Sequence, residues 1–185
     1  VTSFGATKDS IDQVAGRGMI VSRGVLLDVA HYRGVKYLAP GSIIPPEELD
    51  AVAKAAGVSV EPGDVVIVRT GWRVNFLETR DGEAWMIGSP GLSWRCAEWL
   101  HNKQAAAVAS DNIAVEVFTP ELPDAGLVFH LLTIRDMGMM LGEIWDLEAL
   151  SQDCAADGVY SFLLVAQPLR VSGAVGSPVN PVAIK

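Results

Sequence analysis

Histidine is scarce in this chain of 185 residues, which contains only His31, His101 and His130. Its two cysteines, Cys96 and Cys154, are too few for a disulfide framework and are typical of a reduced compartment. Basic residues are outnumbered, 14 against 22 acidic ones, which disfavours nucleic acid and anionic membranes as partners. No apolar run approaches the roughly 18 residues of a membrane span, and the first residues lack the apolar segment of a secretory signal. We therefore expect a cytoplasmic protein.

Several catalytic motifs are also missing. The sequence contains no nucleophile elbow, no glycine loop for phosphate and no dinucleotide fingerprint. Neither cysteine has a histidine beside it in sequence, so a cysteine hydrolase is a distant alternative that requires a partner from elsewhere in the fold. The composition, with 50% hydrophobic and 19% charged residues, is that of a globular protein, and the length fits one domain.

The hydrophobic pattern alternates between strands and helices. Buried strands are predicted over 23–30, 64–70, 105–111, 139–145 and 158–171, with a short edge strand over 177–185. Helices are predicted over 40–57, 92–104, 126–138 and 146–152, the last with Asp146 as N-cap. Residues 73–91 are predicted as a short helix followed by an irregular loop. This order, without a strict βαβ rhythm, predicts an α/β fold with a mixed sheet or open barrel and flanking helices.

His130 and Glu143 are candidates for a metal site. They lie thirteen positions apart, across a predicted helix and the strand that follows it. Imidazole and carboxylate are ligands that Zn²⁺ and Mn²⁺ accept. Because a metal needs three or four ligands and this pair supplies two, residue chemistry alone favours ordinary packing.

Other polar and aromatic residues have two interpretations each. Asp111 ends a small-residue strand, where it can face a site at the sheet edge or simply start a turn. Trp72, Phe76 and Trp85 can line an aromatic pocket, although aromatics beside loops more often serve packing. His101 suits a helix C-terminus, and we expect it, like His31, to have a structural role.

Six blocks of sequence occur together in an order that resembles a known family. They are "RGVLLDVA", "GDVVIVRTGW", "SPGLSWRCAEWL", "ASDNIAVEV", "HLLTIRDMGMMLGEIWDLEAL" and "YSFLLVAQPLRVSGAVGSPVNPVAI". The order is similar to that of the cyclase family, metal-dependent hydrolases that include bacterial kynurenine formamidase and isatin hydrolase. The residues of the first and last blocks resemble those of a subgroup of cyclases with longer sequences. The resemblance implies the family's swivelling fold, a mixed sheet closing towards an open barrel with flanking helices.

The resemblance also implies a chemistry. Family members hydrolyse an amide, formamide or cyclic amide bond with a metal-bound water, so the implied substrate is a small aromatic or cyclic amide and the implied cofactor is Zn or Mn. By resemblance, His130 and Glu143 are metal ligands, and Asp111 and Trp72 lie near the substrate. Homodimers or homotetramers are implied as well.

One family motif is missing from this sequence. The signature H-x-G-T-H-x-D-x-x-x-H, which supplies further ligands and the acid/base histidine, does not occur. In the family it precedes the "RGVLLD" strand, so we expect it upstream of Val1 and read residues 1–185 as the C-terminal portion of a single cyclase domain. The alternative is a metal-free, non-catalytic homologue that serves as a small-molecule binding or assembly module.

Overall fold

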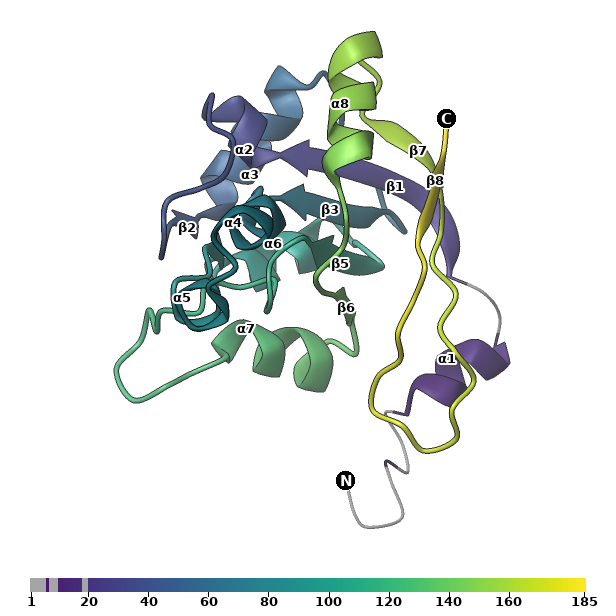
Figure 1. Cartoon of the computed structure of the whole chain (residues 1–185). Coiled ribbons are helices and arrows are strands. Elements are labelled where there is room, and N and C mark those ends of the chain that lie inside the picture. Colours follow the sequence, from purple (N-terminus) through teal and green to yellow (C-terminus); the bar gives the residue numbers. More distant parts are fainter. Residues whose placement is uncertain (1–5, 7–9, 18–19) are drawn as a thin grey trace.

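A six-stranded mixed sheet forms the centre of the molecule (Figure 1). This computed structural model describes residue 6 and residues 10–17 and 20–185. The strand order is β6-β5-β3-β1-β7-β8; β1, β3, β5 and β6 run parallel, and β7 and β8 are antiparallel to their neighbours. The strands are β1 (Val21–Asp28), β3 (Val65–Arg69), β5 (Ala107–Ser110), β6 (Met140–Gly142), β7 (Ser161–Val165) and β8 (Val182–Ile184).

Helices cover both faces of this sheet, and a second small sheet lies beside it. The helices are α1 (Ile11–Arg17), α2 (Val29–Tyr32), α3 (Pro46–Ala55), α4 (Trp72–Thr79), α5 (Gly82–Ile87), α6 (Cys96–Asn102), α7 (Val128–His130) and α8 (Glu148–Asp157). A π-helical turn, η1 (Leu131–Asp136), continues α7. The small parallel sheet pairs β2 (Ile43–Ile44) with β4 (Gly91–Leu92).

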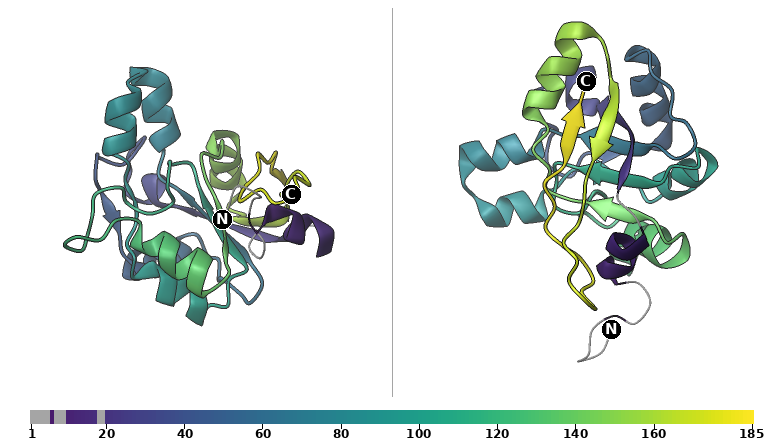
Figure 2. Two further views of the ribbon diagram at one scale, coloured as in Figure 1. Left: turned by 90° about the horizontal axis from the view of Figure 1, so that it is seen from below. Right: turned by 90° about the vertical axis from the view of Figure 1, so that its right-hand side faces the viewer.

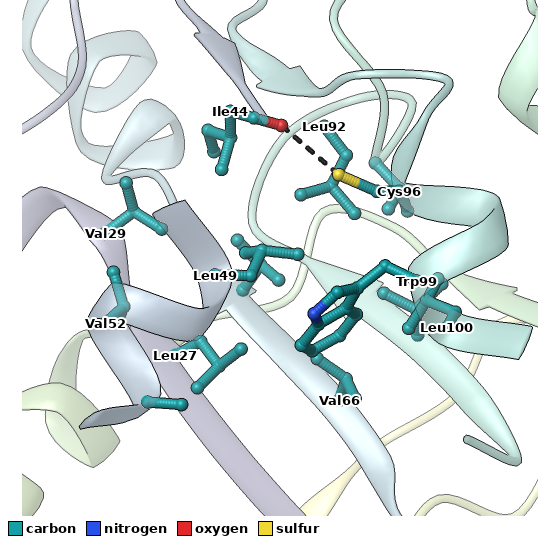
Figure 3. Close-up of a cluster of buried hydrophobic side chains, with 14 of the residues drawn as sticks. Leu27, Val29, Ile44, Leu49, Val52, Val66, Leu92, Cys96, Trp99 and Leu100 are labelled. Atoms are coloured by element: carbon teal, nitrogen blue, oxygen red, sulfur yellow. Dashed lines mark hydrogen bonds between the residues drawn. The ribbon is translucent and has the colours of Figure 1, made fainter. Parts of the chain in front are cut away.

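Alternation along the strands divides the core into two layers. In β1, Leu27 points into a cluster with α3 and α6, whereas Leu26 points to the opposite face, towards α8. Figure 3 shows the first cluster, in which the thiol of Cys96 donates to the carbonyl oxygen of Ile44 at 3.3 Å. Strands buried on both faces explain why the sequence shows continuous apolar runs rather than alternation.

The predicted α/β fold class, a mixed sheet with flanking helices, is confirmed. The sheet is open rather than closed into a barrel, with β6 and β8 as its edges. The predicted strands at 23–30, 64–70 and 105–111 correspond to β1, β3 and β5. The predicted edge strand at the C-terminus is β8. Along the part of the chain that the structure describes, no helix has the length and apolar character needed to cross a membrane.

The prediction of an irregular loop in the second half of 73–91 is wrong, because a second helix, α5, forms there. Asp81 caps it by accepting a hydrogen bond from the backbone N–H of Ala84 at 3.0 Å. The indoles of Trp72 and Trp85 then join α4 to α5, each donating to the other residue's carbonyl oxygen at 2.7 and 2.9 Å. Figure 2 shows α4 and α5 standing out from the body of the molecule.

Further boundaries differ from the predictions. The strand predicted over 23–30 ends at Asp28, and the helices predicted over 40–57 and 92–104 begin at Pro46 and Cys96. Strand β7 is shorter than the predicted 158–171, because Gly158 still caps α8 and the strand ends at Val165, ahead of Pro168, which has no N–H to offer a ladder. Leu147, not Asp146, occupies the N-cap of α8, and Asp146 instead accepts from the backbone N–H of Glu148 at 3.4 Å. The helix predicted over 126–138 begins at Val128 and changes to π-helical geometry after His130.

Candidate functional site

The imidazole of His130 lies between two carboxylates. Its Nδ1 is 2.6 Å from Oε1 of Glu116, and its Nε2 is 3.2 Å from Oε1 of Glu143. His130 is the last residue of α7, Glu143 directly follows β6, and Glu116 lies in the loop that follows β5. The Glu116 side chain is buried and that of Glu143 is 39% exposed, so the Nε2 side of the ring faces the accessible side of the cluster.

The two carboxylates control the protonation of His130. Burial on its own lowers the pKa of the imidazole, but the hydrogen bonds and negative charges of Glu116 and Glu143 outweigh it and raise the pKa to about 9. The metal-free ring is therefore protonated at neutral pH, and a cation that binds Nε2 has to displace a proton.

His130 and Glu143 can supply two of the ligands that a divalent ion needs. Imidazole nitrogen and carboxylate oxygen suit Zn²⁺ or Mn²⁺, and Nε2 and Oε1 face each other. Glu116 lies on the opposite edge of the ring, so it cannot share an ion bound at Nε2. Among the residues described, no group of three or more His, Cys, Asp or Glu side chains is placed to hold a metal ion. These residues contribute to a metal site but do not complete one.

Backbone strain is concentrated around this cluster. Val115, Leu127 and Ile144 have positive φ angles of 58°, 52° and 59°. A positive φ is rare for branched residues and costs about 1–3 kcal/mol, and such strain is enriched at functional sites. Val115 precedes Glu116, Ile144 follows Glu143, and Leu127 is the N-cap of the helix that carries His130. The π-helical turn after His130 is a further irregularity of the kind found at functional sites.

Asp111 is fully buried and binds the turn between β3 and α4. Its carboxylate accepts from Thr70 N–H at 2.8 Å, from the Thr70 hydroxyl at 2.6 Å and from Gly71 N–H at 2.7 Å. Burial raises the pKa of Asp111, although these three donors oppose the shift. The hydrogen bonds described for Asp111 do not include one to His130 or Glu143. Asp111 therefore organises the backbone beside the site.

Trp72 directly follows this turn and is 1% exposed. Its indole N–H donates to the Trp85 carbonyl, and the Trp85 ring packs on that of Phe76 with centroids 5.3 Å apart. The three aromatic side chains thus form the joint between α4 and α5. The structure does not bring Trp72 into hydrogen-bonding contact with His130 in the part of the chain that it describes.

The other histidines and both cysteines have ordinary surroundings. His31 and His101 are exposed, and His101 occupies the last turn of α6. Burial raises the pKa of the Cys96 thiol to about 12 and also raises that of Cys154. Because the thiolate is the nucleophilic form, these shifts disfavour a cysteine hydrolase.

The family of the chain follows from comparison with known proteins. The family model described as "Putative cyclase" matches residues 1–117, more than half of the sequence. This chain belongs to the cyclase family. A comparison with curated proteins gave no significant match.

Solved structures share the cyclase fold. A crystal structure of a novel cyclase is 37% identical, with a TM-score of 0.83, over 95% of this chain and 56% of that one. An isatin hydrolase bound to the product analogue thioisatinate is 20% identical, with a TM-score of 0.69, over 96% of this chain and 62% of that one. A potential metal-dependent hydrolase with cyclase activity is 19% identical, with a TM-score of 0.59, over 97% and 71%. This cyclase-family chain thus spans about three fifths of the first two structures.

Glu116 is the site residue that the sequence analysis missed. It lies in the block "ASDNIAVEV", in which only Asp111 was singled out. A second carboxylate in a block shared with the family was the available signal. Its contact with His130 could not be predicted, because it depends on the path of the loop between Glu116 and α7.

Proposed function

We propose that this cyclase-family chain carries the downstream part of a metal-dependent hydrolase site. The proposed reaction is hydrolysis of an amide, formamide or cyclic amide bond in a small aromatic or cyclic substrate. The observation that carries the proposal is the facing pair of His130 Nε2 and Glu143 Oε1, 3.2 Å apart, in a chain of this family. Structural similarity to an isatin hydrolase and to a potential metal-dependent hydrolase with cyclase activity supports it.

In this proposal, His130 and Glu143 hold a divalent ion, Zn or Mn. The chemistry that such an ion supplies when bound is a lowered pKa of water, towards about 7, and polarisation of the substrate carbonyl. The half-exposed Glu143 leaves the Nε2 side of the ring accessible to a ligand. The remaining ligands and the acid/base histidine are proposed to belong to a histidine-rich stretch outside this sequence.

The test is metal content and turnover of the purified full-length protein, with the histidine-rich stretch that is proposed to supply the remaining ligands. His130→Ala is expected to lower both, because it removes one of two ligands, whereas His101→Ala at the exposed end of α6 should change neither. Substrates to assay include formylated anilines and isatin-like rings. Full metal occupancy and full rate in His130→Ala would overturn the assignment.

The alternative function is a metal-free homologue that binds small molecules or serves in an assembly. The observation that leaves room for it is that the facing pair of His130 and Glu143 supplies only two ligands. It predicts purified protein without bound zinc or manganese and with unchanged folding stability in chelator. Stoichiometric metal would exclude it.

A further inference from the structure

Glu116 forms hydrogen-bond contacts with both the ring and the backbone of His130. Oε1 accepts from His130 N–H at 3.0 Å and lies 2.6 Å from Nδ1, while Oε2 accepts from Phe129 N–H at 3.1 Å. Glu116 is 5% exposed. Three contacts to two consecutive residues fix the position of His130 and the rotation of its ring.

This contact selects one nitrogen of the neutral imidazole. An ionised carboxylate only accepts hydrogen bonds, and both ring nitrogens of His130 face one. The contact of Nδ1 with the buried Glu116 is the shorter, 2.6 Å against 3.2 Å for Nε2 and the more exposed Glu143, so a single proton is placed on Nδ1. The lone pair of the neutral ring is then on Nε2, on the side of Glu143. Carboxylates that hold the far nitrogen of a metal-binding histidine fix its tautomer in this way.

Glu116 is itself held in a rigid backbone. Two backbone hydrogen bonds join its loop to β4. Leu92 N–H donates to the Val115 carbonyl at 2.9 Å, and Val117 N–H donates to the Leu92 carbonyl at 3.0 Å. Gly91 packs so closely that a Cβ on it would lie 2.4 Å from the carbonyl carbon of Glu116. A side chain that positions a ligand needs this kind of support.

A capping role alone does not account for these contacts. Capping of α7 explains the bonds to the two backbone N–H groups, but not the 2.6 Å approach to the ring nitrogen. Glu121 provides the comparison. It accepts from Trp94 N–H at 2.9 Å and from the Ser93 hydroxyl at 2.8 Å ahead of α6, without a histidine among these contacts.

We propose that Glu116 is a positioning residue, which holds His130 with Nδ1 as donor so that Nε2, beside Glu143, is the nitrogen offered to a divalent cation. The inference rests on the proposed function, because a cation at Nε2 is the purpose of the arrangement. Glu116 itself touches neither the cation nor the substrate.

The first experiment measures the tautomer of His130 by ¹⁵N NMR in chelator at about pH 10.5, where the ring is neutral. We expect Nδ1–H in the wild type, a mixture of tautomers in Glu116→Gln, and Nδ1–H in the control Glu121→Gln. An Nε2–H ring in the wild type would overturn the proposal, even if Glu116→Gln failed to fold.

The second experiment measures Zn²⁺ and Mn²⁺ affinity by calorimetry on the full-length protein and its variants, with the histidine-rich stretch included, because His130 and Glu143 alone do not complete a metal site. Glu116→Gln is expected to weaken binding by about 10- to 100-fold, and Glu121→Gln to leave it unchanged. If the wild type binds and Glu116→Gln binds as tightly, this inference is wrong and the proposed function stands. If the wild type binds neither ion, the proposed function is wrong and the inference falls with it.

Discussion

Gly91 packs directly against the backbone of Glu116. A Cβ on Gly91 would lie 2.4 Å from the carbonyl carbon of Glu116 and 2.5 Å from its oxygen. Both atoms belong to the main chain and cannot rotate away as a side chain would. The close approach of β4 to this loop therefore depends on the absence of a side chain at position 91.

Gly91→Ala is expected to destabilise the fold by about 1–3 kcal/mol, because the clash forces the loop of Glu116 to shift. Urea denaturation measures the loss, and NMR of the His130 ring should report the displaced Glu116. The control is Gly82→Ala in α5, where a Cβ meets no atom within 4 Å. Equal stability of the two variants would contradict the prediction.

The ring of His130 should titrate well above the ordinary range of histidine. Glu116 and Glu143 raise its pKa from 6.5 to about 9 in spite of burial. The folded state thus holds its proton more tightly than the unfolded state. The resulting stabilisation is fully present below about pH 6.5 and disappears as the pH rises through about 9.

The measurement is an NMR titration of His130 in chelator, together with denaturation at pH 6 and at about pH 10. Glu143→Gln should lower the midpoint, because it removes one of the two negative charges beside the ring. A midpoint at or below 6.5 in the unmodified chain would show that the carboxylates do not hold the ring as described.

Arg69 neutralises a buried carboxylate at the end of β1. Its Nη1 donates to Oδ1 of Asp28 at 3.0 Å, and its Nε and Nη2 bind Glu148 at 2.8 and 2.9 Å. Arg69→Met would leave Asp28, which is 3% exposed, without a cation, and is expected to cost about 3–5 kcal/mol. Arg135→Met breaks only the exposed pair with Asp136 and should scarcely change the denaturation midpoint. A similar loss in both variants would contradict this account.

Asp111→Asn tests whether Asp111 supports the backbone or contacts substrate. The carboxylate accepts from four donors, including the Ser110 hydroxyl at 3.4 Å, and the N–H₂ group of an amide would point at donors instead of accepting from them. We expect a loss of about 1–3 kcal/mol in thermal denaturation. Asp124→Asn, at an exposed residue with φ 58°, should be neutral, because asparagine tolerates that backbone. Lost activity with unchanged stability in Asp111→Asn would instead support contact with substrate.

The sequence by itself determined the elements with strong local signals. The apolar runs at 23–30 and 64–70 favoured buried strands, and the structure forms β1 and β3 there, although residues 29 and 30 already belong to α2. The prolines and acids ahead of residue 49 indicated the helix α3, whose start at Pro46 is later than the predicted 40. The same reading identified the family and paired His130 with Glu143, which the fold brings within 3.2 Å. These features depend on apolar patterns, turn residues and family motifs, all of which can be read from the amino-acid sequence.

Only the tertiary structure decided how the site is supported. Glu116 reaches His130 across a loop that passes through left-handed backbone at Val115, a conformation that local propensity disfavours for a β-branched residue. The donors to Asp111 come from Thr70 and Gly71, about forty positions earlier. Local preference cannot encode such contacts, because they form only when the parallel strands β3 and β5 place their ends at one edge of the sheet.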